Sequence, residues 1–156
     1  MKSYVVSSSH GLSLLRDRWN ALAGDVPFRA HEWLATWWKH YDSEHMRRRE
    51  LHVVCVTSDD GQLVGLAPWY LDRSLAKGRM VRWLGDGKVC TDHLTLLCEP
   101  EYRIDVAATL AQHLVRDFLD WDLGKAISKH RQLNESPLYL CWYSTPGTTY
   151  AEESVA

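Results

Sequence analysis

The sequence lacks a long apolar run. No stretch approaches the roughly 20 apolar residues that cross a membrane as a helix. At the N-terminus, Met1-Lys2 is followed by the short apolar run Tyr4–Val6 and then by polar residues 7–10. This apolar part is too short for a signal peptide. We therefore expect a cytoplasmic protein with no membrane span.

An excess of positive charge is also missing. Lys and Arg number 18 against 20 Asp and Glu, which gives a net charge of -2. Proteins that bind nucleic acid or anionic membranes usually show a basic excess, so we expect neither partner. The one basic cluster, Arg47–Arg49, lies between Glu44 and Glu50 and predicts a solvated turn.

Cysteine pairs of the metal-binding type are absent. Cys55, Cys90, Cys98 and Cys141 are widely spaced and form no CxxC motif. A zinc site would have to use Cys90, His93 and Cys98, and no fourth ligand is evident. We expect buried thiols and no metal site, since disulfides are rare in cytosolic proteins.

Motifs for nucleophilic catalysis or phosphate binding are missing as well. The run Ser7–Ser9 has no flanking glycines of the nucleophile-elbow type. Gly85-Asp86-Gly87 lacks the context of a phosphate loop and predicts a turn. Asp92 and His93 are adjacent on an expected strand, so their side chains point to opposite faces. We expect no catalytic, cofactor-binding or metal-binding residue, and mostly surface or structural roles for the other histidines: His10, His31, His40, His45, His52, His113 and His130.

The chain does contain clear helix and strand patterns. Residues 3–7 predict a short strand, and Ser9 is a suitable N-cap for a helix that ends at Gly24. A second helix is expected from His31 to Tyr41. The apolar face of the first helix consists of Leu12, Leu15, Trp19, Leu22 and Ala23.

Four aromatic residues fall on the second helix. Trp33, Trp37 and Tyr41 share a stripe at i, i+4 and i+8, with Trp38 at its edge. They could stack on sugar rings, but aromatics at helical spacing are usually core residues. We therefore expect the stripe to face the core.

The middle of the chain predicts a β-hairpin. Two β-rich runs, residues 51–57 and 62–71, are joined through Asp60-Gly61, a dipeptide that favours tight turns. Pro68 cannot donate a ladder hydrogen bond, which predicts a bulge or an edge position. Further strands are expected at Met80–Leu84 and His93–Cys98.

The strongest helix pattern begins at Pro100. Its expected buried face consists of Ile104, Ala107, Ala108, Leu110, Ala111, Leu114, Val115 and Phe118. After Trp121 the pattern decays, although residues 138–143 could form one more strand. The element order predicts an α+β (or α/β) fold with a mostly antiparallel sheet. We expect one domain over residues 1–122 and a divergent, partly disordered tail over residues 123–156.

Several short motifs follow one another along the chain. They are Leu15-x3-Trp19-x2-Leu22, Pro27-Phe28, Trp33-x3-Trp37-Trp38, Gly61-x-Leu63-Val64-Gly65-x-Ala67-Pro68, Val81-x2-Leu84-Gly85, Asp92-His93-Leu94 and Trp121-Asp122. In this order and spacing they resemble the N-terminal half of GNAT-type acyltransferases of the CelD-like (cellulose biosynthesis) and FemAB-like group. The similarity extends from about Leu12 to Trp121, with His93 where that group usually has an aromatic residue.

The resemblance implies two tandem GNAT-like folds, the second of which uses acetyl-CoA or another acyl-CoA. GNAT enzymes bind the donor pyrophosphate on a glycine-rich loop at the N-terminus of the central helix, where free amides and the helix dipole favour an anion. Here that place is taken by Glu99-Pro100-Glu101. We therefore expect a degenerate, non-catalytic GNAT-like half from a truncated or frame-shifted gene, with a second half or partner protein and a small-molecule or saccharide acceptor.

Two other functions remain open at this point. The first is a small, autonomous acetyl-CoA-dependent N-acyltransferase with an unusual donor site. The second is a non-enzymatic interaction module that uses the aromatic face of the helix at residues 31–41.

Overall fold

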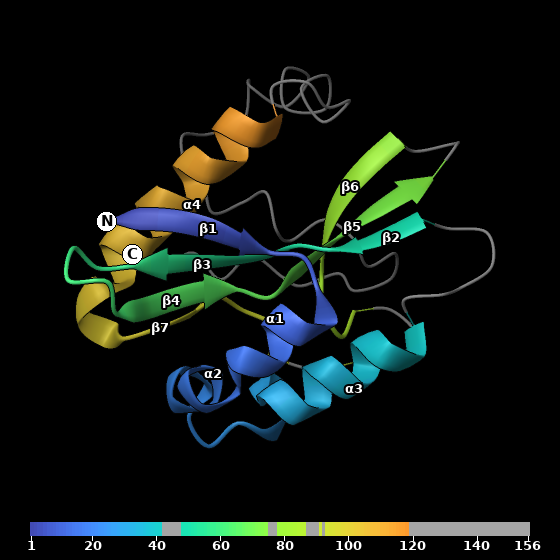
Figure 1. Ribbon diagram of the computed structural model, residues 1–156, viewed down its shortest axis with the longest axis horizontal. Coiled ribbons are helices and arrows are strands. Elements are labelled where there is room, and N and C mark those ends of the chain that lie inside the picture. The colour runs from blue at the N-terminus through green and yellow to red at the C-terminus, as the bar shows by residue number, and fades with distance from the viewer. Residues whose placement is uncertain (42–47, 75–77, 87–90, 92, 119–156) are drawn as a thin grey trace, which may run out of the picture.

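The computed structural model shows an α+β fold, as the element order predicts. It describes residues 1–41, 48–74, 78–86, 91 and 93–118. Antiparallel strands form the middle layer, with helices on both faces (Figure 1). Within these residues, no helix is both long and apolar enough to cross a membrane.

The strands form two antiparallel sheets. The four-stranded sheet has the order β1-β3-β4-β7 and the three-stranded sheet has the order β2-β5-β6. The strands of the first are β1 (Lys2–Val6), β3 (Val53–Thr57), β4 (Leu63–Ala67) and β7 (Leu97–Cys98). Those of the second are β2 (Arg48–Leu51), β5 (Trp69–Ser74) and β6 (Gly78–Trp83).

Two long strands run through both sheets: β2 continues into β3, and β4 continues into β5. A single residue, His52, separates β2 from β3, and Pro68 separates β4 from β5. The His52 amide donates to the Trp69 carbonyl (3.1 Å), and the Leu84 amide donates to the Pro68 carbonyl (2.8 Å). Backbone pairing therefore continues across the breaks, and Pro68 interrupts an interior strand instead of lying at an edge or in a bulge.

The β3–β4 hairpin confirms the expected turn at Asp60-Gly61. Gly61 has φ of 84°, a conformation that glycine adopts without a steric penalty. The Ser58 amide closes the turn on the Gln62 carbonyl (2.9 Å). The register shifts between Val56 and Thr57, so the bulge lies next to the turn.

The first predicted helix is two helices, α1 (Ser9–Leu14) and α2 (Arg16–Ala23). The N-cap is Ser8, one residue before the predicted Ser9, and its hydroxyl accepts from the Gly11 amide (3.0 Å). Gly24 ends α2 with φ of 62°, as expected. The break at Leu15 lets both helices bury apolar residues against the same face of the sheet.

Helix α3 (His31–Tyr41) has the predicted bounds, but its core face is rotated. His31, Leu34, Trp37 and Trp38 are buried, whereas Trp33 remains 37% exposed. The Trp33 indole instead packs edge-to-face with Phe28. The prediction that Trp33 faces the core and Trp38 only caps its edge is therefore wrong.

Helix α4 (Arg103–Phe118) follows the 3-10 turn η2 (Pro100–Tyr102). Its buried residues are Val106, Leu110 and His113. The predicted buried face is wrong for Ile104 (84% exposed), Val115 (65% exposed) and Ala108, which is also exposed. A polar residue, His113, belongs to the core face, and this shifts the face away from the apolar pattern.

The core has one part on each side of the sheet. Alternate strand residues such as Val53 and Cys55 pack under α1–α3, whereas Val54 and Val56 pack under α4. Figure 1 shows α4 on one face and the other three helices on the opposite face. This alternation follows from the two-residue repeat of a strand that is buried on both faces.

The predicted strand His93–Cys98 is much shorter than expected, since β7 contains only Leu97 and Cys98. His93 has φ of 59°, which is incompatible with a strand. The turn at Gly85 is confirmed, with φ of 93°. The predicted strand at residues 138–143 and the predicted tail, residues 123–156, lie outside the described residues.

Two cysteines are described and both are free. Cys55 is buried and Cys98 is half-buried; Cys90 and Cys141 lie outside the described residues. Burial raises the pKa of the Cys55 thiol from 9.0 to about 11. Burial likewise raises the pKa of Tyr4, which lies beside Cys55, to about 12.

These two groups predict a loss of stability in alkali. Above pH 9 the unfolded chain releases the Cys55 proton while the folded chain retains it, so stability falls as the pH rises towards 11. The loss from Cys55 is about 2–3 kcal/mol by linkage. Urea denaturation of the wild type and of Cys55→Ala and Tyr4→Phe at pH 8–11 measures it. Equal slopes in wild type and Cys55→Ala would contradict the prediction.

Candidate functional site

The entry to α4 is the place where a GNAT donor loop is expected. Glu99 is the N-cap of η2, and its amide donates to the Val64 carbonyl (3.0 Å). Pro100 has no amide hydrogen. The amides of Tyr102 and Arg103 donate to the carbonyls of Glu99 and Pro100. Four of the five backbone nitrogens from 99 to 103 therefore have no free N–H to donate to a phosphate.

The side chains at this entry are also unsuited to an anion. Glu99 forms an ion pair with Arg18, which reaches over from α2. Arg18 Nε also donates to the Leu63 carbonyl (2.7 Å). The guanidinium is thus already paired with a carboxylate, and Glu101 adds a second, exposed negative charge. The entry is a structural junction between α2, β4 and α4.

Close packing holds α4 against β4. A Cβ atom added to Gly65 would lie 2.6 Å from Cγ1 and 2.8 Å from Cγ2 of Val106. Only glycine permits this approach. Gly65 also pairs with Cys98, so it fixes α4 above the strand that leads into it.

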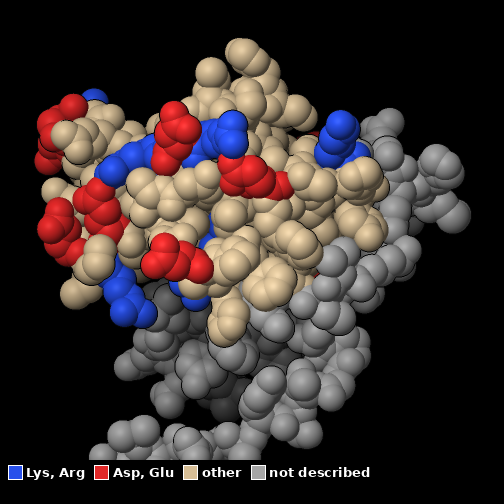
Figure 2. All heavy atoms as spheres, turned by 90° about the horizontal axis from the view of Figure 1, so that it is seen from below, with Lys and Arg blue, Asp and Glu red and all other residues tan. Residues whose placement is uncertain are grey.

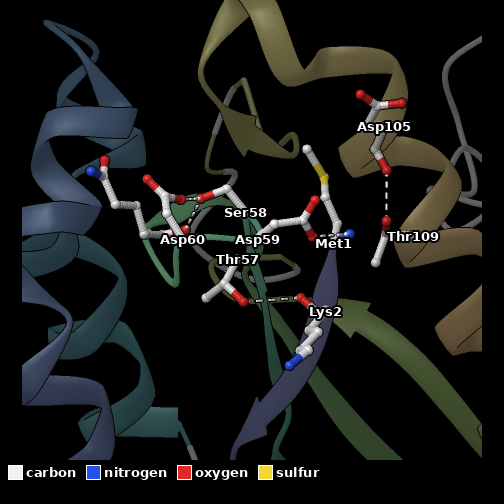
Figure 3. Close-up of polar contacts among 9 residues, drawn as sticks. Met1, Lys2, Thr57, Ser58, Asp59, Asp60, Asp105 and Thr109 are labelled. Carbon is white, nitrogen blue, oxygen red and sulfur yellow. Dashed lines mark hydrogen bonds and ion pairs between the residues drawn. The ribbon is translucent and has the colours of Figure 1, made fainter.

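A surface hollow of about 720 Å³ lies beside the N-terminal half of α4. Three segments far apart in sequence border it: the start of β1, the β3–β4 turn and α4. Figure 3 shows labelled residues of all three segments. Its lining residues are Met1, Ser58, Asp59, Asp60, Tyr102, Asp105, Ala108, Thr109 and Gln112.

The polar contacts in the hollow give it an acidic character. The Met1 amine forms an ion pair with Asp59 Oδ1 (3.0 Å; Figure 3). The Ser58 hydroxyl donates to Asp60 and holds the pKa of that carboxyl below its usual range. Asp105 adds a third carboxylate from α4. Three carboxylates against one amine suit a hydrogen-bond donor or a cation and repel a polyphosphate.

A second polar cluster is buried between α3 and the β2-β5-β6 sheet. Asp86 accepts from the Tyr70 hydroxyl (2.7 Å) and from Arg82 Nε (2.6 Å). Arg82 also lies 3.6 Å from the fully buried Asp72. Burial, and then the Asp86 charge, raises the pKa of Tyr70 above its usual value. Arg82 is shared by the two carboxylates and joins β5, β6 and the turn that follows β6.

Arg49 belongs to this region and was not expected there. Its guanidinium lies over the rings of Trp37 (5.9 Å) and Tyr70 (5.5 Å). It also donates to the Tyr41 carbonyl. The prediction of a solvated turn at Arg47–Arg49 is therefore wrong for Arg49, which lies half-buried on β2. Because Arg49 follows two other arginines, the sequence did not distinguish it as a residue that makes a cation–π contact.

The histidines do not form a catalytic pair with a carboxylate among the described residues. His93 is exposed, and its carbonyl accepts from Arg29 Nε (3.0 Å); Asp92 lies outside the described residues. His113 lies 3.4 Å from the Ser3 hydroxyl and its ring is 5.8 Å from that of His52. These contacts join β1, the β2–β3 junction and α4 within the core.

The face of the molecule formed by α1–α3 carries mixed charge. Figure 2 shows acidic and basic side chains interspersed over it. Arg16 Nε and Glu32 Oε1, from α2 and α3, form one such pair at 2.6 Å. This face offers no broad patch of a single sign.

Comparison with known proteins does not assign a function to the chain. No family model, no curated protein and no solved structure matches the chain. The element order, the entry to α4 and the acidic hollow are therefore the evidence from which a function is proposed.

Proposed function

We propose that the chain is a non-catalytic, N-terminal half of a GNAT-type acyltransferase similar to the CelD-like and FemAB-like group. The element order supports this proposal. A first strand is followed by helices, by two long antiparallel strands that are each interrupted once, by strand β6, and by a helix that follows the edge strand β7. This is the order expected of a GNAT domain up to its central helix.

The observation that carries the non-catalytic role is the backbone at the entry to α4. Glu99, Tyr102 and Arg103 donate their amides within the protein, and Pro100 has none. The hollow beside α4 is lined with carboxylates. A donor with several phosphates would meet negative charge and few free amides there.

The proposal implies a partner. The chain would serve that partner as a scaffold or as the domain on the acceptor side. A second GNAT-like half would bind acetyl-CoA or another acyl-CoA and transfer the acyl group to an amine or hydroxyl. The acceptor would be a small molecule or a saccharide, in the cytoplasm, within cellulose or envelope polysaccharide synthesis. The short motifs from Leu12 to Trp121 support this extension.

The interaction module that uses aromatic side chains on α3 receives less support. Trp37 and Trp38 are buried, and Trp37 stacks on Tyr41 and Tyr70 inside the protein. Only Trp33 of the four aromatics could present much of its ring to a sugar or a partner. We therefore retain the acyltransferase half as the proposed function.

Calorimetric titration with acetyl-CoA tests the non-catalytic role. We expect no binding heat with the donor at about 1 mM, a concentration that would detect weak sites. A folded GNAT enzyme with a glycine-rich loop is the positive control. A dissociation constant in the micromolar range would overturn the non-catalytic role and favour an autonomous enzyme.

The family relationship has a separate test. The DNA downstream of the coding sequence is expected to encode a second GNAT-like half that contains a glycine-rich donor loop. If no reading frame encodes such a half, the proposal of a half-enzyme is wrong, whatever the outcome of the titration.

A further inference from the structure

Helix α4 has a second apolar face that points away from the core. Ile104 is 84% exposed and Val115 is 65% exposed. Ala108 is exposed and Ala111 half-buried between them. At about 100° per residue, these four positions lie within roughly 60° of one another on the helix surface. They form a narrow apolar stripe, called here the outer stripe.

The outer stripe lies on the side of α4 opposite its core face. Val106, Leu110 and His113 point into the protein and are at most 2% exposed. A surface helix of a monomer usually has one apolar face and one polar face. A second apolar face on such a helix is a candidate contact surface.

The order of residues in the outer stripe is symmetric. Ile104 and Val115 are its large ends, about 16 Å apart along the helix, and Ala108 and Ala111 are its small centre. If the stripe is laid antiparallel on a second copy, each Ile104 meets Val115 of the partner subunit. Each Ala108 then meets Ala111 of the partner subunit, and the small side chains allow the helices to approach closely.

The charges beside the outer stripe follow the same symmetry. Glu101, Asp105, Gln112 and Arg116 are exposed and lie along one flank of the stripe. The acidic residues are at its start and the basic one is at its end. In an antiparallel pair, Arg116 of one copy therefore lies against Asp105 and Glu101 of the partner subunit. A parallel two-fold pair would instead turn the two charged flanks to opposite sides of the contact, so that Arg116 would not face these carboxylates.

We propose that the outer stripe of α4 is a two-fold symmetric interface between two copies of this chain. An isologous contact requires a patch that is complementary to itself, and both the apolar order and the charges of the stripe meet this requirement. The inference does not rest on the proposed acyltransferase relationship. Helices α1–α3 lie on the other side of the sheet and are not part of the interface (Figure 1).

The interface is small, so the dimer is weak. Each copy contributes four short apolar residues and one charged flank, which cover less area than a standard stable interface. We expect a dissociation constant of roughly 10–100 µM, which places the monomer–dimer equilibrium within reach of sedimentation equilibrium.

The first test is sedimentation equilibrium of the full chain and of Ile104→Glu. The wild type is expected to dimerise, and the variant is expected to weaken the dimer at least about tenfold, since the substitution occurs twice in the interface. Leu14→Glu is the matched control, because Leu14 is 74% exposed and lies on α1. Its dimerisation should equal that of the wild type.

Charge exchange tests the antiparallel arrangement. Arg116→Glu should weaken the dimer, and Glu101→Arg combined with Asp105→Arg should also weaken it. Combining all three changes should restore dimerisation towards the wild-type value. Failure of the combined variant to recover, with its thermal unfolding unchanged, would overturn the antiparallel pairing.

Other occupants of the stripe give distinct results. A full chain that stays monomeric at millimolar concentration overturns the proposal. If residues 119–156 covered the stripe instead, the chain would be monomeric and Ile104→Glu would lower the melting temperature more than Leu14→Glu does. A dimer that Ile104→Glu leaves intact would place the interface elsewhere and overturn the proposal as well.

Discussion

Trp19→Ala is expected to lower the free energy of unfolding by about 3–5 kcal/mol, the cost of truncating a large core side chain. Trp19 is fully buried on α2 and packs edge-on against His31 of α3. Its indole also donates to the Arg29 carbonyl (2.8 Å). The residue thus joins α2, the turn before α3 and α3 itself. Urea denaturation followed by circular dichroism measures the loss.

Two further variants separate the causes of this loss. Trp19→Phe keeps much of the volume and removes the hydrogen bond to Arg29, with an expected cost of about 1–2 kcal/mol. Trp33→Ala is the matched control, because it deletes the same side chain from a site that is 37% exposed. A cost at Trp33 as large as that at Trp19 would contradict the assignment of Trp19 to the core.

Gly65→Ala is expected to destabilise the fold by about 1–3 kcal/mol, the usual range for overpacking. The new methyl group would meet both branches of Val106, and the backbone of α4 would have to move away from β4. Because Val106 is fully buried, it has no free space into which it can turn. Chemical denaturation of the purified variant gives the value.

A double variant tests this steric explanation. Val106→Ala alone leaves a cavity, and adding Gly65→Ala places a methyl group into that space. The two substitutions should therefore cost less together than the sum of their separate effects. Additive costs would show that Gly65 is needed for some reason other than contact with Val106.

Local signals predicted the elements whose ends are marked by particular residues. The tight-turn dipeptide Asp60-Gly61 identified the hairpin, and Gly24 identified the end of α2. Helix α3 has the predicted bounds, His31–Tyr41. In each case the signal depends on the conformational preferences of a few neighbouring residues, which the sequence displays directly.

The buried face of each helix, and the depth at which a side chain is buried, were harder to predict because both depend on contacts between residues far apart in sequence. Two apolar faces compete on α4, and the sheet selects the one that includes the polar His113. Trp33 is turned outward because His31 and Leu34 occupy the core-facing positions of α3. Arg49 is stacked on Trp37 and Tyr70, which are brought to it by other elements.

The candidate site was predicted in part. The acidic entry to α4 is visible in consecutive residues, Glu99-Pro100-Glu101. The hollow is not, since it brings Met1, Asp59 and Asp105 together from three distant segments. The same applies to Asp72, Asp86 and Arg82, whose separate positions in the sequence give no sign of a shared buried cluster.

The interruptions at His52 and Pro68 also protect the alignment of the strands during folding. A long uninterrupted hairpin could slip, and a slip of one residue would send Val54 and Val56 to the opposite face. The hydrogen bond from the His52 amide to the Trp69 carbonyl can form only when the two breaks lie side by side. A misaligned hairpin therefore loses this bond and the burial of its apolar residues.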